Sequence, residues 1–369
     1  MQLTKLQLIN FKNYTDSSFD FSKRINIFVG DNGAGKTNIL DAIYYNSFCK
    51  SAFNPIDSQN IRHGEEFFTI KGIYRTGGES KDEILVAVKK NERKRVKLNT
   101  KEYSRLADHI GLFPLVMISP SDSSMIYGGS EERRKYIDGV ISQFDHQYLD
   151  TLLNYNKVLQ HRNALLKALN LNRGMDTSTI EVWDEKMCFL GTQIHEKRKA
   201  FLEDFIPLIR RYYEFISNER EEVGITYRSQ LNEGVCLEML QQNFQKDLAL
   251  KHSSTGVHRD DIVFTINNYP LRKFGSQGQQ KSFLLALKIA QFEYIKEKKG
   301  YKPLLLLDDV FDKLDYKRVQ QLMKLVSRNE FGQIFVTDTN RERVERIFKE
   351  IEVDISVFEI KDGEINEQN

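Results

Sequence analysis

Apolar and polar positions alternate over short distances in the first third of the chain, and this pattern predicts strands and turns up to about Ile118. The run LQLINF opens the region, and INIFV (Ile25–Val29) is apolar enough for a buried strand. In EILVAVKKNERKRVKLN, two alternating runs flank a polar centre. This stretch therefore predicts a hairpin whose polar tip lies near Asn91.

After Glu131 the apolar spacing changes to gaps of three and four, the period of one helix face. The first run comprises Ile137, Ile141, Phe144, Tyr148, Leu152, Tyr155 and Leu159. A break at NLNRGMDTST (residues 170–179) precedes a second run of Trp183, Met187, Leu190, Ile194, Phe201, Phe205, Leu208 and Tyr212. We predict an antiparallel helix hairpin with arms of about 35 residues, or ~50 Å each. We interpret Trp183 and the tyrosines as core residues rather than ligand contacts.

Composition narrows the class of protein only slightly. A chain of 369 residues can hold two or three domains, and its net charge of +2 points to no acidic partner by itself. Cys49, Cys188 and Cys236 form no C-x-x-C pair, so we expect three buried thiols rather than a zinc site or a disulfide framework. The chain shows neither an apolar run of membrane-spanning length nor a signal peptide. We expect a soluble cytoplasmic protein without membrane contact.

A glycine-rich loop, VGDNGAGKTN, separates the strand INIFV from the helical run ILDAIYYNSF. Gly30, Gly35, Lys36 and Thr37 fit the pattern G-x-x-x-x-G-K-[ST]. Such glycines turn backbone N–H groups towards an anion at a helix N-terminus. Lys36 would reach the β- and γ-phosphates of ATP, and the Thr37 hydroxyl would bind Mg²⁺. We predict a nucleotide site, rather than an ordinary turn, formed by Gly30, Asp31, Asn32, Gly33, Ala34, Gly35, Lys36, Thr37 and Asn38.

Two adjacent carboxylates follow an apolar run near the other end of the chain, in PLLLLDDVFDKLD. Leu304–Leu307 predict a parallel strand buried on both faces, and Asp308 and Asp309 then fall at its carboxyl end, where open α/β sheets bind ligands. Like charges there are costly unless a cation offsets them. We predict that Asp308 holds Mg²⁺ and that Asp309 orients the attacking water. The alternative is a pair of helix-capping residues.

A third small-residue motif, KFGSQGQQKSFLLALKIAQ, precedes the Asp308 strand. Gly275, Ser276 and Gly278 come before an amphipathic helix, so their backbone N–H groups could face an anion. Taken alone, the motif is a helix cap. Between a glycine loop and an Asp-Asp strand, it resembles the signature loop of ABC-type ATPases. That order excludes most kinases and small GTPases.

Two charged segments allow both a functional and a structural interpretation. The hairpin tip carries six cations and no aromatic residue, a composition that suits DNA phosphates about as well as a solvated turn. These cations are Lys89, Lys90, Arg93, Lys94, Arg95 and Lys97. The segment His258–Asp261 offers one histidine and two carboxylates, which is a weak metal pattern. For it we favour a structural or interface network.

These motifs together resemble the RecF family of SMC-like ABC ATPases, over nearly the whole chain. The resemblance is carried by LQLINFKNY, GDNGAGKTNILDAIY, ISPSDSSMIYGGSEERRKYID, STGVHRDDIVF, GSQGQQKS and LLLLDDVFDKLD. It implies an α/β P-loop head assembled from both chain ends, with a short helical arm inserted. The domains expected are a head segment at 1–120, the arm at 121–250 and a second head segment at 251–369.

The resemblance also implies roles for single residues. Lys36 and Asp309 take catalytic positions, Thr37 and Asp308 bind the metal, and Ser276 and Gly278 contact the γ-phosphate held by a second subunit. The implied dimer interface comprises Ser276, Gln277, Gly278 and Asp315. Thr337 and Asp338 stand where transporter ATPases carry a switch histidine.

The chain departs from the family pattern at two places. No arginine follows Ser51, where the sequence continues as AFN, so a nucleotide or DNA contact from that arginine is not expected. Asp309 replaces the glutamate of most ABC ATPases, and its shorter side chain implies slow hydrolysis.

The resemblance implies ATP and Mg²⁺ as cofactors, and DNA, including gapped duplexes, as a partner. It further implies an ATP-dependent homodimer that helps to load RecA at single-strand gaps during DNA repair, with RecR and RecO. Two alternative classes of protein predict other sequence features. A transporter ATPase subunit would carry a histidine where VTDTN stands, and an SMC-like ATPase with an added nuclease domain would extend well beyond the head.

Overall fold

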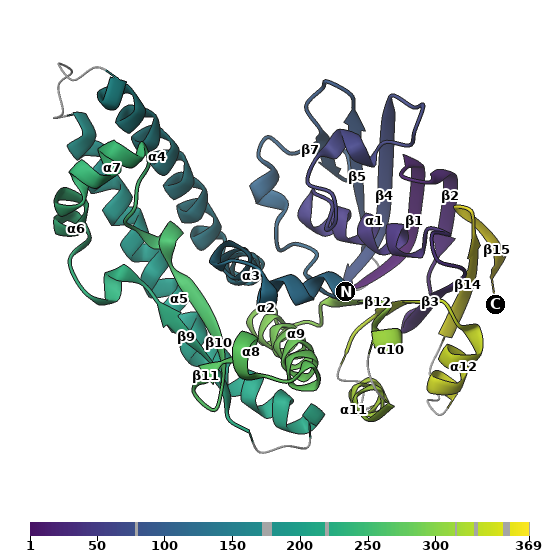
Figure 1. The fold of residues 1–369 in the computed structure, drawn as a ribbon. Coiled ribbons are helices and arrows are strands. Elements are labelled where there is room, and N and C mark those ends of the chain that lie inside the picture. The colour runs from purple at the N-terminus through teal and green to yellow at the C-terminus, as the bar shows by residue number, and fades with distance from the viewer. Residues whose placement is uncertain are drawn as a thin grey trace. The chain divides into compact units, whose positions relative to one another are not determined.

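The computed structural model describes residues 1–77, 80–171, 179–217, 221–313, 316–327, 331–349 and 355–368 (Figure 1). The chain forms two compact units. Unit 1 comprises residues 1–122, 212–218 and 284–369, and unit 2 comprises residues 123–211 and 219–283. Both chain ends therefore contribute to unit 1. Residues 251–283 belong to unit 2, whereas the expected division assigned them to the head.

Unit 1 contains an antiparallel sheet built mainly from the N-terminal strands predicted by alternation. Its strand order is β2-β1-β4-β5-β6-β7. The strands are β1 (Gln2–Phe11), β2 (Tyr14–Asp20), β4 (Phe67–Gly77), β5 (Ser80–Lys89), β6 (Arg95–Leu98) and β7 (Lys101–Glu102). Strands β5 and β6 pair antiparallel around a tip where Asn91 has a φ of 60°, as the hairpin prediction required.

A second sheet of unit 1 is assembled from both ends of the sequence, in the order β15-β14-β3-β13-β12-β8. Its strands are β3 (Ile25–Val29), β8 (Leu115–Ile118), β12 (Leu304–Asp308), β13 (Ile334–Asp338), β14 (Ile355–Lys361) and β15 (Glu364–Gln368). All neighbours pair in parallel except β15, which returns antiparallel beside β14. Burial of every residue of β3, β12 and β13 explains their continuous apolar runs.

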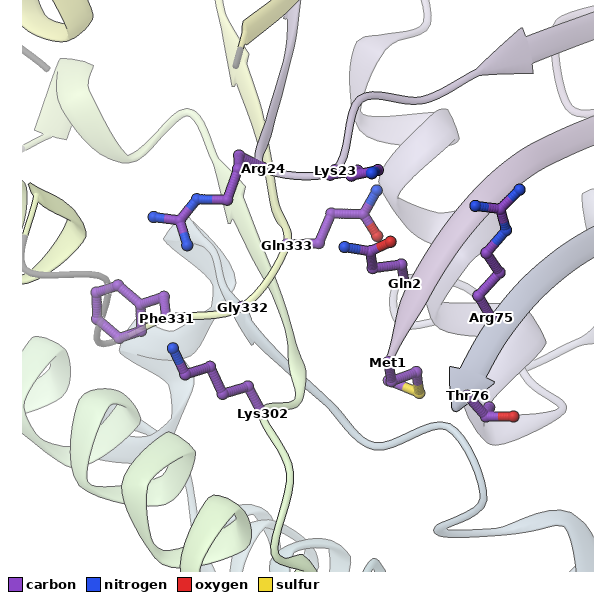
Figure 2. Close-up of a pocket in the computed structure, with 10 residues that line it drawn as sticks. All are labelled: Met1, Gln2, Lys23, Arg24, Arg75, Thr76, Lys302, Phe331, Gly332 and Gln333. Carbon is purple, nitrogen blue, oxygen red and sulfur yellow. The ribbon is translucent and has the colours of Figure 1, made fainter. Parts of the chain in front are cut away.

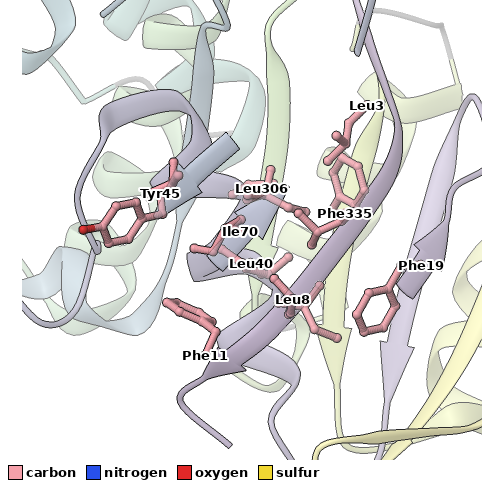
Figure 3. Packing of buried hydrophobic residues seen from close by; sticks show 14 of the residues in the cluster. Leu3, Leu8, Phe11, Phe19, Leu40, Tyr45, Ile70, Leu306 and Phe335 are labelled. Carbon is pink, nitrogen blue, oxygen red and sulfur yellow. The ribbon is translucent and has the colours of Figure 1, made fainter. Parts of the chain in front are cut away.

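Helix α1 (Lys36–Phe48) packs between the two sheets and completes one hydrophobic core. In Figure 3, Leu8 and Ile70 from the first sheet meet Leu40 of α1, and Leu306 and Phe335 approach from the second sheet. Each of these side chains is fully buried. The helix that carries the end of the glycine loop is therefore held on both sides. Unit 1 is completed by α10 (Val310–Lys313), α11 (Tyr316–Ser327), α12 (Arg341–Lys349) and most of α9 (Gln277–Lys299).

Unit 2 contains α4 (His146–Leu171) and most of α5 (Thr179–Ser217), the predicted pair of long helices, which run side by side in Figure 1. The first arm is not continuous from Glu131, because residues 143–145 separate α3 (Ser130–Ser142) from α4. The spacing of apolar positions by three and four residues continues across this break, so the sequence pattern does not reveal it. Pro207 lies inside α5, a helix of 39 residues.

The rest of unit 2 is a small antiparallel sheet with short helices. The sheet has the order β11-β10-β9, with β9 (Val223–Arg228), β10 (Asp261–Ile266) and β11 (Tyr269–Pro270). The short helices are α2 (Ser124–Tyr127), α6 (Cys236–Gln242), α7 (Phe244–Leu250) and α8 (Leu271–Phe274).

The expectation of three free thiols is wrong. Cys188 of α5 and Cys236 at the start of α6 form a disulfide, with Cα atoms 5.5 Å apart, and Cys49 is a buried free thiol. The pairing was not visible in the sequence because the two cysteines are 48 residues apart. Only the return of the chain from β9 to α6 brings them together.

Two buried arginines join the elements of unit 2, and one of them, Arg198, contacts the His258–Asp261 segment. Arg198 of α5 bonds Asp138 and Asp260 at 2.9–3.0 Å, while Arg162 of α4 bonds Asp184 and Asp247. Each arginine is paired with two carboxylates, which offsets the large cost of burying its charge. The segment therefore acts as the structural network that we favoured over a metal site.

Candidate nucleotide site and signature loop

The second sheet of unit 1 brings its polar loops to one edge, because the carboxyl ends of parallel strands coincide. The glycine loop follows β3, Asp308 ends β12 with Asp309 directly after it, and Thr337 and Asp338 end β13. Since β13 lies between β3 and β12, Thr337 stands between the two nucleotide motifs. Segments far apart in the sequence thus form one site.

The glycine loop adopts a backbone that side chains would obstruct. Gly30, Gly33 and Gly35 have φ values of 152°, 86° and 114°, in the region that favours glycine. A Cβ atom on Gly30 would lie 2.2 Å from the carbonyl oxygen of Ile360, and one on Gly35 would lie 2.4 Å from the Asn13 amide. Glycine is therefore required at both ends of the loop, and α1 begins directly after it at Lys36.

The Lys36 side chain folds back over the loop. Its ammonium donates hydrogen bonds of 2.8 Å to the carbonyl oxygens of Gly30 and Asp31. The side chain is held by backbone acceptors rather than by a carboxylate, so its charge is not neutralised by these bonds. A phosphate placed in the concave loop would meet this charge together with the N-terminus of α1.

Asp308 is the centre of a hydroxyl–carboxylate cluster. Its Oδ1 accepts hydrogen bonds from Thr37 at 2.8 Å and from Thr337 at 2.9 Å. Burial raises the pKa of this carboxyl, and the neighbouring Asp309 raises it further, against the lowering effect of the two hydroxyls. A carboxylate and a hydroxyl at this distance fit Mg²⁺, which prefers oxygen ligands and offsets such a buried charge. Thr37 and Asp308 are therefore together, as predicted.

Asp309 lies beside this cluster in a left-handed backbone conformation, with φ of 46°. Its backbone N–H donates to the Thr337 hydroxyl at 2.9 Å, so Thr337 links the two aspartates. Thr337 is fully buried and Asp338 pairs with Arg343 at 2.7 Å. Transporter ATPases carry a switch histidine at this position. Here Thr337 hydrogen-bonds Asp308, and Asp338 pairs with Arg343 of α12.

Two residues that support the glycine loop were not singled out from the sequence. Asn13 donates to the Ala34 carbonyl at 3.0 Å and accepts from Asn38 at 2.7 Å, and the Tyr14 hydroxyl donates to the Gly35 carbonyl. The signal was present in the FKNY stretch of the opening motif. The sequence alone does not show that Asn13 and Tyr14 contact the glycine loop, because this contact depends on where β1 and β2 lie in the fold.

The loop after Ser51, where the family arginine is missing, is fixed by another basic residue. The fully buried carboxylate of Asp41 accepts hydrogen bonds from the Ser51 hydroxyl and the Ala52 N–H, each at 2.7 Å. Lys12 completes this cluster, with its ammonium 2.7 Å from Asp41 and 5.5 Å from the centre of the Phe53 ring. A cation therefore does lie beside the AFN segment, although it comes from the end of β1.

The signature motif forms a capping box in unit 2. The Ser276 hydroxyl accepts from the Gln279 N–H at 3.2 Å, and the Gln279 side chain accepts from the Ser276 N–H at 2.6 Å, at the start of α9. Ser276 and Gln277 are exposed, so they can be reached by a partner. Asp315, expected at the dimer interface, lies outside the described residues.

The cations of the hairpin tip differ in their surroundings. Lys89 pairs with Glu92 at 2.6 Å, and Lys90 pairs with Glu66 at 2.8 Å, both at exposed positions. Lys94 is more enclosed, because it bonds Asp57 at 2.8 Å and the Cys49 carbonyl at 2.6 Å. Lys94 therefore has a structural role in the residue 49–57 loop.

The fold and this site define an ATPase head of the SMC-like ABC class. A family model described as RecF/RecN/SMC N terminal domain matches residues 2–365. The DNA replication and repair protein RecF of Phocaeicola vulgatus is 47% identical over 369 residues, covering 100% of this chain and 99% of that protein. RecF of Flavobacterium johnsoniae is 48% identical over 98% of this chain and 100% of that protein. The chain belongs to the RecF family.

Solved structures agree with this assignment. The recombination mediator protein RecF of the RecFOR pathway, in its ATP form, superposes with a TM-score of 0.89 at 30% identity, covering 100% of this chain and 97% of that one. An Smc head domain from Pyrococcus furiosus is similar in fold alone, with a TM-score of 0.57 at 18% identity over 98% of this chain and 94% of that one. Within the described part of the chain, no helix is both long and apolar enough to cross a membrane.

Proposed function

We propose that this protein is an ATP-dependent DNA-binding recombination mediator, which dimerises through its heads on ATP and hydrolyses ATP slowly. The observation that carries the proposal is the Thr37–Asp308–Thr337 cluster, placed next to a glycine loop in a chain that also exposes a signature loop. The relative described as a RecF in its ATP form supports ATP as the ligand. We expect the protein to act in the cytoplasm during DNA repair.

The chain's own residues supply the binding chemistry. Backbone N–H groups of Gly33–Thr37 and the Lys36 ammonium hold the triphosphate, while Thr37 and Asp308 hold Mg²⁺. Bound Mg²⁺ would neutralise charge on the phosphate oxygens. Asp309 orients the attacking water and accepts its proton at the carboxylate. Because its side chain is one methylene shorter than that of glutamate, we expect it to reach the water less well and hydrolysis to be slow.

Dimerisation follows from the division of the anion-binding groups between two loops. Lys36 serves the γ-phosphate from one subunit, and Ser276 and Gly278 of the other subunit cover it, with Gln277 and Asp315 at the interface. ADP lacks that phosphate and therefore releases the dimer, so hydrolysis limits the time spent on DNA. We further propose that the dimer on gapped duplex DNA acts with RecR and RecO to promote RecA loading.

A mixing experiment tests the shared site. Lys36→Met should lose ATP binding, and Ser276→Arg should bind ATP as a monomer and fail to hydrolyse it. Mixed in equal amounts, they should recover up to about a quarter of wild-type ATPase activity, because half of randomly paired dimers are mixed and each has one intact site. Ser276→Asn, which keeps a capping side chain, controls for damage to α9. No recovery, while wild-type protein still dimerises on ATP, would refute the shared site.

A further inference from the structure

Unit 1 has a cavity of about 460 Å³ that lies away from the nucleotide site. Figure 2 shows Arg24 and Lys302 on its Phe331 side, and Arg75 on its Met1 side. Its lining residues are Met1, Gln2, Lys23, Arg24, Arg75, Thr76, Lys302, Phe331, Gly332 and Gln333. The volume falls within the roughly 300–1,000 Å³ typical of ligand sites.

The cavity lies at the amino ends of the parallel strands. Lys23 and Arg24 directly precede β3, Lys302 precedes β12, and Phe331–Gln333 precede β13. The glycine loop and Asp308 lie at the carboxyl ends of the same strands. A five-residue strand separates the two edges by about 16 Å, so a ligand in the cavity would not touch the nucleotide site.

The charged side chains that line the cavity all carry the same sign. Four cationic side chains line it, two of them arginines, and its lining includes no carboxylate among the residues that the structure describes. The Gln2 amide and the Thr76 hydroxyl add neutral polar groups. A concave site lined by one sign of charge concentrates ions of the other sign. The planar guanidinium groups of Arg24 and Arg75 suit phosphate oxygens in particular.

The cavity is also held in shape by a buried side chain. Gln333, which is 1% exposed, donates from Nε2 to the carbonyl oxygens of Leu3 and Ser22 at 2.8 Å, and accepts from the Leu3 N–H at 2.8 Å. This glutamine joins the start of β1, the segment before β3 and the segment before β13. The backbone that carries Gln2, Lys23 and Arg24 is therefore set before any ligand arrives.

We propose that this cavity is a second anion site, which binds phosphate groups independently of the nucleotide site. The groups could belong to a DNA strand or to a free phosphate compound, since both present the same oxygens to Arg and Lys. Phosphate is favoured because arginines, lysines, an amide and a hydroxyl are the side chains that commonly contact phosphates. The proposal does not depend on dimerisation or on hydrolysis.

The test removes one lysine and one arginine from the cavity, as Lys23→Gln/Arg75→Gln. The matched control, Arg62→Gln/Lys101→Gln, removes the same charges elsewhere in unit 1. Binding of inorganic tripolyphosphate, of a short duplex DNA and of a poly-glutamate peptide is measured by titration, with saturating Mg²⁺–ADP to fill the glycine loop. ADP affinity serves as the readout of correct folding and should stay within twofold for both variants.

We expect the cavity variant to bind tripolyphosphate, DNA or both at least tenfold more weakly, and the control to change less than threefold. A loss confined to tripolyphosphate identifies a free phosphate compound as the ligand. A loss confined to DNA, with the slope of log K against log salt flattened by about 0.9 for each lost contact, identifies a DNA strand. Equal losses in both variants, no loss in either, or a loss confined to poly-glutamate would overturn the proposal.

Discussion

The Thr337 hydroxyl donates a hydrogen bond to Oδ1 of Asp308 at 2.9 Å, from strand β13, which lies between β3 and β12 in the sheet. The same hydroxyl accepts the backbone N–H of Asp309 at 2.9 Å. One buried threonine from the middle strand therefore orients the proposed metal ligand and holds the backbone of the proposed water-orienting residue. The arrangement gives Thr337 a role that neither nucleotide motif supplies.

Removal of this hydroxyl by Thr337→Val should weaken the response to Mg²⁺. Burial already raises the pKa of Asp308, and the Thr337 hydroxyl lowers it. Without that hydroxyl the pKa should rise further, so a proton should compete more strongly with Mg²⁺ for the carboxylate. We expect the Mg²⁺ concentration for half-maximal ATPase activity to rise about three- to tenfold, with a larger difference from wild type at lower pH. Thr337→Ser keeps the hydroxyl and should behave as wild type. Identical Mg²⁺ titrations for the valine and serine variants would remove Thr337 from the site.

Replacement of Asp309 should separate ATP binding from hydrolysis. Asp309→Asn keeps the side-chain size and tolerates the positive φ, so the fold should be retained. We expect at least a hundredfold lower turnover, with ATP affinity within threefold of wild type. Light scattering with ATP should show an accumulated dimer. Wild-type turnover in this variant would exclude Asp309 from hydrolysis.

The nucleotide site was accessible to sequence reasoning because its chemistry lies in short contiguous motifs. The strand before Gly30, the helix after the glycine loop and the strand before Asp308 were each predicted, and the structure contains all three. A parallel sheet then fixes which edge receives the loops. Thr37 and Asp308 meet for that reason, although 271 positions separate them.

Features that depend on long-range packing were not accessible in this way. The support of Asn13 for the glycine loop needs the return of β2 beside β15, and the Cys188–Cys236 bond needs the path from β9 to α6. The break between α3 and α4 left the apolar period intact. Local patterns report which face of an element is buried, but they do not report which other element covers it.

The hairpin tip remains a candidate DNA contact, and its cations can now be tested in two groups. Lys89→Gln/Lys90→Gln/Arg93→Gln changes exposed residues whose ion pairs are worth little, so stability should be kept. If the tip touches DNA, affinity should fall about tenfold for any sequence, and each lost contact should flatten the salt slope by about 0.9. An unchanged slope would place the DNA surface elsewhere. Lys94→Gln, in contrast, should loosen the residue 49–57 loop.

His258 should make unit 2 less stable in mild acid. Its Nδ1 accepts from the Tyr155 hydroxyl at 2.8 Å and its Nε2 donates to the Ser253 carbonyl at 3.1 Å, so the neutral ring is the bonded form. Burial lowers its pKa to about 4, with neighbouring Arg259 lowering it further. Between pH 6.5 and 4 the unfolded chain binds more protons than the folded chain, so stability falls as pH falls, by up to about 3 kcal/mol.

The fluorescence of Trp183, the single tryptophan and a residue of α5, reports the unfolding of unit 2 in denaturant. Because burial raises the pKa of Asp260, which contributes with the opposite sign, the comparison is between wild type and His258→Gln at each pH. We expect the variant to lose less stability than wild type between pH 6.5 and 4. Parallel pH profiles would show that His258 is not protonated on unfolding.

Thiol counting tests the disulfide and the environment of Cys49 together. Burial raises the pKa of Cys49 to about 12, so the reactive thiolate is scarce at neutral pH and the folded chain should react slowly with a thiol reagent. Protein unfolded without reductant should show one thiol per chain, and three after reduction, since Cys188 and Cys236 are bonded. The Cys49→Ser variant should show no thiol before reduction and two thiols after it. Three thiols before reduction would show that the bond does not form in solution. If the bond forms, it should stabilise unit 2 by about 2–4 kcal/mol in Trp183 unfolding curves, because it closes a long loop in the unfolded chain.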